Sequence, residues 1–305
     1  MFSYRHAFHA GNHADVLKHT VLIATLDYLL EKDAALTVVD THAGAGLYRL
    51  DGDYAGASGE ATQGVMRLLA SKGSPGAPAE LAPVLQRYLD IVVNDFNPGK
   101  GSARIYPGSP FITQHLLRDH DRLKLYELHP TDSRTLDGNI AQLEAGRQIA
   151  VLREDGFGSA TKFLPPPSRR ALVLCDPSYE IKSDYGRVAA CLQESLKKFA
   201  TGSYMVWYPV IPRPEAHELP RRLKTLANQA GKPWLHATLN IGQSPERANT
   251  HTPGEKPMRQ GLTASGVFLV NPPHTLKAAL QQVLPQLVEV LGRGRGQGHA
   301  VESGG

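Results

Sequence analysis

The stretch ALVLCDPSY, residues 171–179, decides the fold of this chain. Five consecutive apolar residues that end at a carboxylate and a proline are typical of a strand buried on both faces of a parallel sheet. Open α/β sheets bind their ligands at the carboxyl ends of such strands, and Asp176, Pro177 and Tyr179 follow this one. We therefore expect a carboxylate, a rigid turn and an aromatic ring to meet at a binding site.

These three residues suit a flat base that carries an amine. The lone pair of an exocyclic adenine amine is delocalised into the ring, so its nitrogen is a poor nucleophile. Asp176 and the Pro177 carbonyl can accept both N–H groups and favour a tetrahedral nitrogen, while Tyr179 stacks on the extruded base. Methyl transfer then depends on in-line positioning, and Asp176 can take the proton afterwards. The alternative is an Asp-Pro turn over a structural tyrosine.

A glycine-containing loop follows an earlier strand. The β-branched run at 37–39 leads through Asp40 into a loop with His42, Gly44 and Gly46. Glycine lets a backbone approach a nucleotide closely, although a plain tight turn would look the same. No GK[ST] triplet follows, which argues against a phosphate-binding P-loop.

Two further strands end in carboxylates. The run at 123–126 closes with Glu127, which is placed to accept hydrogen bonds from ribose hydroxyls. The run at 149–152 leads to Asp155, which can accept a hydrogen bond from an adenine amine or serve only as a turn residue. Together with Asp176, these positions indicate a nucleotide site at one edge of the sheet.

Strand-like runs alternate with helical runs, which predicts an α/β fold with a mostly parallel, doubly wound sheet of seven strands. The strands are expected at 37–39, 123–126, 149–152, 171–175, 204–207, 235–241 and 266–270. The apolar spacing at 14–30 predicts an amphipathic helix with Asn12 as its N-cap, and Ser109 is expected to cap a helix at 111–117. Periodicity alone does not settle which way Lys18 and His19 face.

The core is expected to comprise residues 1–51 and 102–292, with 52–101 forming a helical insertion subdomain. Residues 242–261 are expected to form a long basic loop able to touch a phosphate backbone. The tail at 293–305 is glycine-rich and is expected to be flexible.

The amino-acid composition narrows the class of protein to which the chain can belong. The 305 residues carry a formal charge of +4, which leans weakly towards an anionic partner. No apolar run is long enough to span a membrane and no secretory leader is evident, so we expect a cytoplasmic protein. Cys175 and Cys191 are expected to be buried thiols. The spacing of His6, His9 and His13 matches no compact ligand motif, so no metal is expected.

Eight motifs taken together resemble the ribosomal RNA large-subunit methyltransferase J family. They are SYRHAFHAGNHADVLKHT at 3–20, DTHAGAG at 40–46, YPGSP at 106–110, ELHP at 127–130, DGF at 155–157, LPPPSRR with the tetrapeptide after the following strand, WYPV at 207–210 and GLTASG at 261–266. The resemblance covers nearly the whole chain. It implies a Rossmann-like class I methyltransferase that transfers a methyl group from S-adenosylmethionine, releasing S-adenosylhomocysteine, to the N6 amine of an adenine in protein-free 23S rRNA.

The resemblance also implies roles for individual residues. Asp176 would be the catalytic carboxylate, Tyr4 would contact the RNA, and the insertion would help to recognise it. Cofactor binding would fall to Lys18, His19, His42, Gly44, Ser109, Glu127, Asp155, Gly156 and Asp176. The protein is expected to act as a monomer, with no metal and no membrane partner.

Two positions test the resemblance. Ser178 stands where the family usually has a second proline, which loosens the turn but spares Asp176, the Pro177 carbonyl and Tyr179, so activity is expected to survive. Asn271 begins a second, similar tetrapeptide after the last strand. If that strand is antiparallel, as the resemblance implies, Asn271 lies at the opposite edge and is structural.

Other functions remain open at this stage. The nearest enzymatic alternative is methylation of another planar amine, in DNA adenine or a protein glutamine. A non-catalytic RNA-binding assembly factor is an alternative of a different class.

Overall fold

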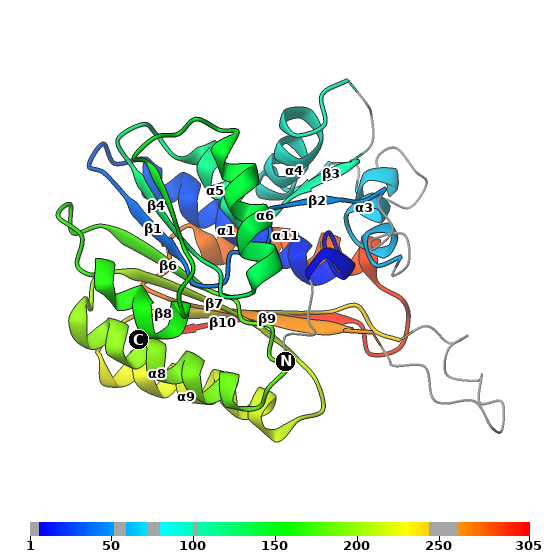
Figure 1. Ribbon diagram of the computed structural model, residues 1–305. Helices are drawn as coiled ribbons and strands as arrows, with labels where there is room; N and C mark the ends of the chain where they lie inside the picture. The colour runs from blue at the N-terminus through cyan, green and yellow to red at the C-terminus, as the bar shows by residue number, and fades with distance from the viewer. Residues whose placement is uncertain (1–5, 52–58, 72–77, 79, 100–102, 244–260) are drawn as a thin grey trace.

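A computed structural model of the chain describes residues 6–51, 59–71, 78, 80–99, 103–243 and 261–305. Its centre is an eight-stranded sheet with strand order β10-β8-β9-β7-β6-β1-β4-β5 (Figure 1). Six strands point the same way: β1 (Thr37–Asp40), β4 (Arg122–Tyr126), β5 (Ile149–Leu152), β6 (Ala171–Cys175), β7 (Ser203–Pro209) and β8 (Trp234–Asn240). The mostly parallel α/β sheet is confirmed, and all seven expected strands are present.

Strand β6 lies in the middle of the sheet and is buried along its whole length. Leu172 and Leu174 belong to the hydrophobic core on one face, whereas Val173 and Cys175 belong to the core on the other. The strand pairs in parallel with β1 on one side and β7 on the other. A continuous apolar run is therefore required here, because both faces of the strand are covered by helices.

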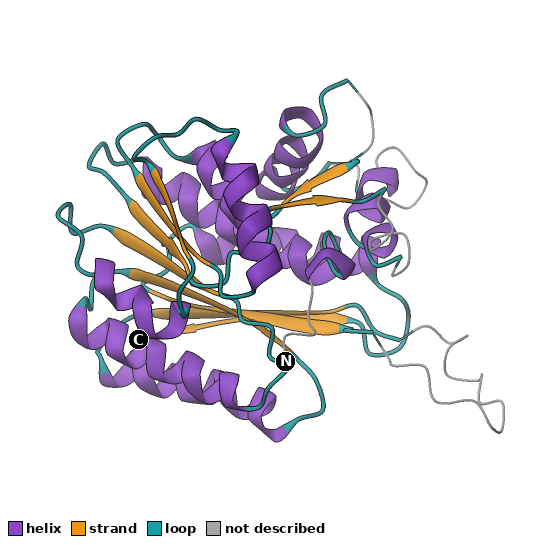
Figure 2. Cartoon of the chain, viewed as in Figure 1, coloured by secondary structure: helices purple, strands orange, loops and turns teal. Residues whose placement is uncertain are grey.

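Helices cover both faces of the sheet (Figures 1 and 2). One face carries α1 (His13–Leu30), α5 (Ser109–Leu116), α6 (Pro130–Ala141) and α11 (Leu276–Leu291). The other carries the short α7 (Gly156–Ser159) with η4 (Ala160–Phe163), and the long α8 (Ser183–Lys198) and α9 (Pro214–Gln229). None of the described helices combines the length and apolar character that a membrane crossing requires.

Helix α1 differs from the amphipathic helix that its sequence predicts. Asn12 caps it as expected, accepting the backbone N–H groups of Ala14 and Asp15 at 2.9 Å each. Its first three turns are buried on every side, because three helices and two strands surround them. These are α4 (Pro83–Asp90), α5, α11, β7 and β9 (Ala264–Val270). Lys18 and His19 are therefore both buried, at 4% and 0% exposure.

The described part of the 52–101 region contains η2 (Ala61–Gln63), α3 (Val65–Ser71), α4 (Pro83–Asp90) and η3 (Ile91–Asp95). Leu68 and Tyr88 from these helices belong to the same apolar core as α1. Beside them β2 (Leu47–Arg49) and β3 (Ile105–Pro107) form a small antiparallel sheet that the sequence did not predict. The described part of the region is helical, and α4 packs directly on the N-terminal helix.

The C-terminal residues correct one expectation. Residues Gly298–Gly304 form strand β10, which pairs antiparallel with β8 at the edge of the sheet. Exposed strand residues and several glycines hide this strand from pattern analysis, because an edge strand needs backbone partners more than apolar side chains. The expected seventh strand is β9 (Ala264–Val270), which runs antiparallel between β7 and β8. The long loop expected at 242–261 falls largely outside the described residues.

Candidate active site

A cavity of about 280 Å³ opens at the carboxyl edge of the sheet, where β1, β4, β5 and β6 end. Most of the residues proposed from the sequence line it: His19, His42, Gly44, Ser109, Glu127, Asp155, Gly156, Asp176 and Pro177. Segments that are far apart in the sequence are brought together here because parallel strands end at one edge. Tyr4 lies outside the described residues.

The glycine loop orients Glu127. The Gly44 N–H donates to one oxygen of this carboxylate at 2.8 Å, and the His129 N–H donates to the other at 2.7 Å. Gly44 has φ +61°, and a Cβ there would lie 2.3 Å from the Tyr48 hydroxyl oxygen. Burial raises the pKa of Glu127, and its two backbone hydrogen bonds oppose that rise. The loop therefore needs glycine and presents an oriented acceptor.

Two of the histidines that line the cavity are neutral imidazoles. Burial lowers the pKa of His42 to about 3, and its ring lies edge-on to Phe157 with centroids 4.6 Å apart. Burial also lowers the pKa of His19 to about 3. His19 Nδ1 hydrogen-bonds the Tyr106 hydroxyl at 2.8 Å, whereas its buried Nε2 has no partner among the described residues. That unpartnered nitrogen is suited to a ligand.

Ser109 does not cap its helix as the sequence predicts. Gly108 holds the N-cap position of α5, and the Ser109 hydroxyl donates instead to Asp40 at 2.6 Å. Burial raises the pKa of Asp40 to about 6, and the bond from Ser109 opposes this. Sequence reasoning noted Asp40 only as a strand end, although its position as the last residue of β1 was a usable signal.

Asp155 begins helix α7. One of its oxygens accepts the Phe157 N–H at 3.1 Å, and the other is paired with the Arg187 guanidinium. A Cβ at Gly156 would lie 2.0 Å from the carbonyl oxygen of Thr41, so the chain can pass this close to β1 only with glycine. Arg187 was missed by sequence reasoning, because helical spacing alone does not bring it to the end of β5.

Lys18 lies behind the cavity and contacts the catalytic candidate directly. Its ammonium nitrogen lies 2.5 Å from Asp176 Oδ2 and 2.9 Å from Asp15 Oδ1. Burial alone would lower the pKa of Lys18, but the two carboxylates raise it well above its ordinary value. Lys18 is not among the residues that line the cavity, and its ammonium group holds the Asp176 carboxylate. Its expected contact with the cofactor stays a prediction.

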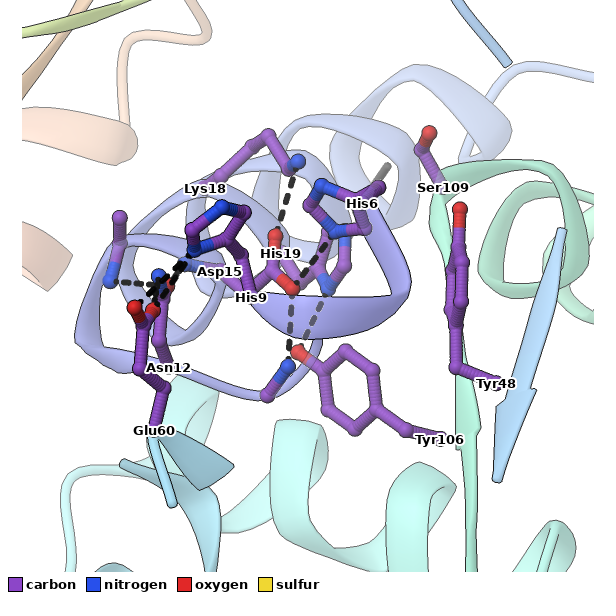
Figure 3. A network of polar contacts seen from close by, with 12 residues as sticks. His6, His9, Asn12, Asp15, Lys18, His19, Tyr48, Glu60, Tyr106 and Ser109 are labelled. Carbon is purple, nitrogen blue, oxygen red and sulfur yellow. Dashed lines mark hydrogen bonds and ion pairs between the residues drawn. The ribbon is translucent and has the colours of Figure 1, made fainter. Parts of the chain in front are cut away.

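Asp15 anchors this ion-pair network at the start of α1 (Figure 3). It accepts the Gly11 N–H at 2.9 Å and also contacts His6 Nε2 at 3.0 Å. Burial would raise the pKa of Asp15, but the charges of His6 and Lys18 hold it well below its ordinary value. No sequence pattern assigns a role to Asp15, which is 2% exposed.

The structure places Tyr179 under the turn, away from the cavity. Its side chain is 2% exposed, and its hydroxyl donates to the Trp207 carbonyl at 2.6 Å. Its φ of +54° reverses the backbone, so Ser178 and Glu180 line the cavity while Tyr179 points inward against Tyr185. Stacking of Tyr179 on a base is not seen in this conformation.

The N-terminal histidines and the second tetrapeptide have structural partners. His9 contacts Glu60, His13 hydrogen-bonds the Leu262 carbonyl, and no metal-holding group of His, Cys, Asp or Glu occurs among the described residues. Asn271 donates to the carbonyls of Ala200 and Gly202 at the opposite edge of the sheet, as expected for a structural residue. Cys175 and Cys191 are buried free thiols.

The polar groups that line the cavity fit S-adenosylmethionine. Glu127 and Asp155 offer carboxylates to hydroxyl and amine donors, and the loop at Gly44 lets the backbone approach a ligand closely. The orphaned Nε2 of His19 offers one more polar contact inside the cavity. Carboxylates also predominate over permanent cations in the lining, which suits a ligand with a sulfonium charge.

The chain is similar to known proteins over nearly its whole length. The family model described as "Ribosomal RNA large subunit methyltransferase D, RlmJ" matches residues 33–302. The chain is 40% identical over 303 residues to ribosomal RNA large subunit methyltransferase J of Escherichia coli, covering 99% of this chain and 98% of that one. The protein of the same name from Haemophilus influenzae is 37% identical over 291 residues, covering 95% and 94%. A crystal structure from Legionella pneumophila matches with TM-score 0.79 and 29% identity, covering 97% and 98%.

Proposed function

This chain belongs to the ribosomal RNA large subunit methyltransferase J family, and from that premise we propose which residues carry out its reaction. The enzyme uses S-adenosylmethionine to methylate the N6 amine of an adenine in ribosomal RNA. The observation that carries the assignment of roles is that Asp176 lines the cavity at the end of β6, with one carboxylate oxygen already held by Lys18.

The cofactor is held by residues that line the cavity at the carboxyl edge of the sheet. These are His19, His42, Gly44, Ser109, Glu127, Asp155 and Gly156. Glu127 accepts hydrogen bonds from ribose hydroxyls, and Asp155 accepts one from the adenine amine. When bound, S-adenosylmethionine supplies a methyl group activated by a sulfonium.

Asp176 and Pro177 orient the amine that is methylated. Lys18 occupies Oδ2 of Asp176, and Oδ1 has no hydrogen-bond partner among the described residues, so it is available to one N–H of the amine. The Pro177 carbonyl accepts the other N–H. The amine nitrogen, held in this way, would receive the methyl group that the bound cofactor supplies, and Asp176 would take up the amine proton. Positioning of this kind can supply much of the barrier reduction.

Tyr179 supports the reaction through the backbone. Its hydroxyl donates to the Trp207 carbonyl, which ties the turn after β6 to β7. In this conformation it serves as a positioning residue. Tyr4, by its place in the N-terminal motif, is proposed to contact the RNA.

The finer assignments are also proposals. The substrate is protein-free 23S rRNA, and the enzyme acts as a cytoplasmic monomer. The relatives' names specify the large subunit, and the charge of +4 suits a polyanionic partner. The 52–101 insertion contributes to RNA recognition.

The test is methyl incorporation from labelled S-adenosylmethionine into protein-free 23S rRNA, followed by nucleoside analysis for N6-methyladenosine. We expect the Asp176→Ala and Asp176→Asn variants to lose activity while still binding S-adenosylhomocysteine. Asp137→Ala, which removes an exposed carboxylate of α6, is the matched control. Full activity of either Asp176 variant would overturn its catalytic role. Preferential methylation of DNA or of a protein glutamine would overturn the substrate.

A further inference from the structure

Arg187 occupies one wall of the cavity and has no role in the proposed reaction. It lies in the first turns of α8, and its side chain is 41% exposed. Of the described residues that line the cavity, it is the one arginine, and no lysine accompanies it. We therefore ask what this permanent cation does in a wall that otherwise offers carboxylates, histidines and apolar groups.

Three neighbours hold the guanidinium in place. It forms an ion pair with Asp155 Oδ2, and its Nη1 lies 3.9 Å from Asp184 Oδ1. Its Cζ lies 4.3 Å from the centre of the Phe157 ring. Guanidinium groups are suited to combining a carboxylate contact with stacking on an aromatic face. The side chain is therefore fixed although it is partly exposed.

These contacts connect the parts of the wall. Asp155 follows β5, Phe157 lies in α7, and Phe157 in turn packs against His42 of the loop after β1. Arg187 attaches α8 to this group from the solvent side. One side chain thus ties together the elements that form one end of the cavity.

The ion pair also decides how Asp155 is presented. Oδ1 is used by the Phe157 N–H at the start of α7, so Arg187 fixes the rotation of the carboxylate through Oδ2. A carboxylate oxygen has two acceptor sites, so Oδ2 can still accept a hydrogen bond from an amine. Without Arg187 the charge of Asp155 would face Asp184 and Glu154 with no compensating cation in the lining.

We propose that Arg187 is a positioning residue for the adenine end of the cofactor, holding Asp155 as the acceptor of the adenine amine and clamping Phe157 against His42. The inference rests on the proposed function, in which Asp155 receives that amine. It predicts that Arg187 contributes to every ligand that carries an adenine, irrespective of what is attached to the ribose. It also predicts that Arg187 makes no contribution to RNA binding.

The experiment compares Arg187→Met and Arg187→Lys with Lys197→Met, which removes an exposed cation from the same helix. Binding of S-adenosylhomocysteine and of 5′-methylthioadenosine is measured by calorimetry or by competition with labelled cofactor. Steady-state kinetics give KM separately for cofactor and for RNA. A charge-assisted contact of this kind corresponds to roughly tenfold or more in affinity.

We expect Arg187→Met to weaken both ligands by the same factor and to raise KM for the cofactor, with kcat and KM for RNA unchanged. Arg187→Lys should recover part of the loss, and Lys197→Met should bind like the wild type. Unchanged binding by Arg187→Met, or a change in KM for RNA alone, would overturn the inference. So would loss of S-adenosylhomocysteine affinity with 5′-methylthioadenosine unaffected. A wild-type enzyme that neither binds S-adenosylhomocysteine nor methylates RNA would instead contradict the proposed function.

Discussion

The ammonium nitrogen of Lys18 lies 2.5 Å from a carboxylate oxygen of Asp176, joining the N-terminal helix to the end of the central strand. The same ammonium contacts the buried carboxylate of Asp15. Helix α1 therefore contributes to the active site through the buried side chain of Lys18 and not through a solvent-exposed face. The first prediction follows from these contacts of Lys18.

Replacing Lys18 with methionine leaves the Asp15 carboxylate buried without its lysine. Removing one partner of a buried ion pair costs about 3 kcal/mol or more. We expect Lys18→Met to lower the free energy of unfolding in urea by that order and to reduce methyl transfer at least tenfold. Lys18→Met combined with Asp15→Asn should recover stability but not activity. Wild-type stability in Lys18→Met would contradict the buried network.

Four buried histidines predict loss of stability in weak acid. Burial lowers the pKa of His19 and His42 to about 3, and that of His13 and His236 to about 4. Because the unfolded chain protonates these groups near pH 6.5 and the folded chain does not, stability is present above pH 6.5 and is lost as pH falls towards 4. Each histidine contributes about 1.4 kcal/mol per pH unit in that window.

Protonation of Asp40 changes the stability in the opposite direction. Because its pKa is raised to about 6, its protonation favours the folded state as the pH falls. The free energy of unfolding in urea should therefore depend on pH between 4.5 and 7 as if fewer than four protons were taken up on unfolding. His236→Gln should reduce that uptake by about one proton. A stability that does not change over this range would contradict the prediction.

Gly156 and Gly158 form a matched pair within α7. A Cβ at Gly156 would lie 2.0 Å from the Thr41 carbonyl oxygen, whereas one at Gly158 would meet nothing within 4 Å. We expect Gly156→Ala to cost about 2 kcal/mol and to weaken S-adenosylhomocysteine binding, because α7 must move away from β1. Gly158→Ala should be neutral or stabilising by up to about 1 kcal/mol. Thermal melting and calorimetry measure both, and equal effects would refute the close approach.

Strand β10 predicts an effect of C-terminal truncation. Deleting residues 298–305 removes the backbone partners of β8 and the ion pair between Glu302 and Lys224. With several hydrogen bonds lost at about 1 kcal/mol each, we expect roughly 3 kcal/mol of destabilisation. Glu302→Gln, which affects only the exposed pair, should cost less than about 1 kcal/mol. Rapid hydrogen exchange throughout 298–304 in the intact chain would contradict the pairing.

The parallel part of the fold was predictable because apolar runs such as 171–175 must be buried on both faces, and the polar residue after each run fixes where ligands bind. The sequence did not predict which way individual side chains point or which side chains contact each other. The direction of Lys18 depends on helices that pack around α1, and the inward turn of Tyr179 depends on a backbone angle of +54° that no sequence pattern specifies. Strand β10 escaped prediction because its glycines and exposed residues carry no apolar period.

The positions of Lys18 and Asp176 in the chain determine when their ion pair can form during synthesis. The two residues are separated by 158 positions. At ribosomal rates of about 5–20 residues per second, roughly 8–30 s pass between the synthesis of the lysine and of its partner. Until β6 has emerged, the nascent chain lacks Asp176, the carboxylate that we propose receives the methylation substrate. An enzyme built in this way cannot modify RNA while its own translation is only half complete.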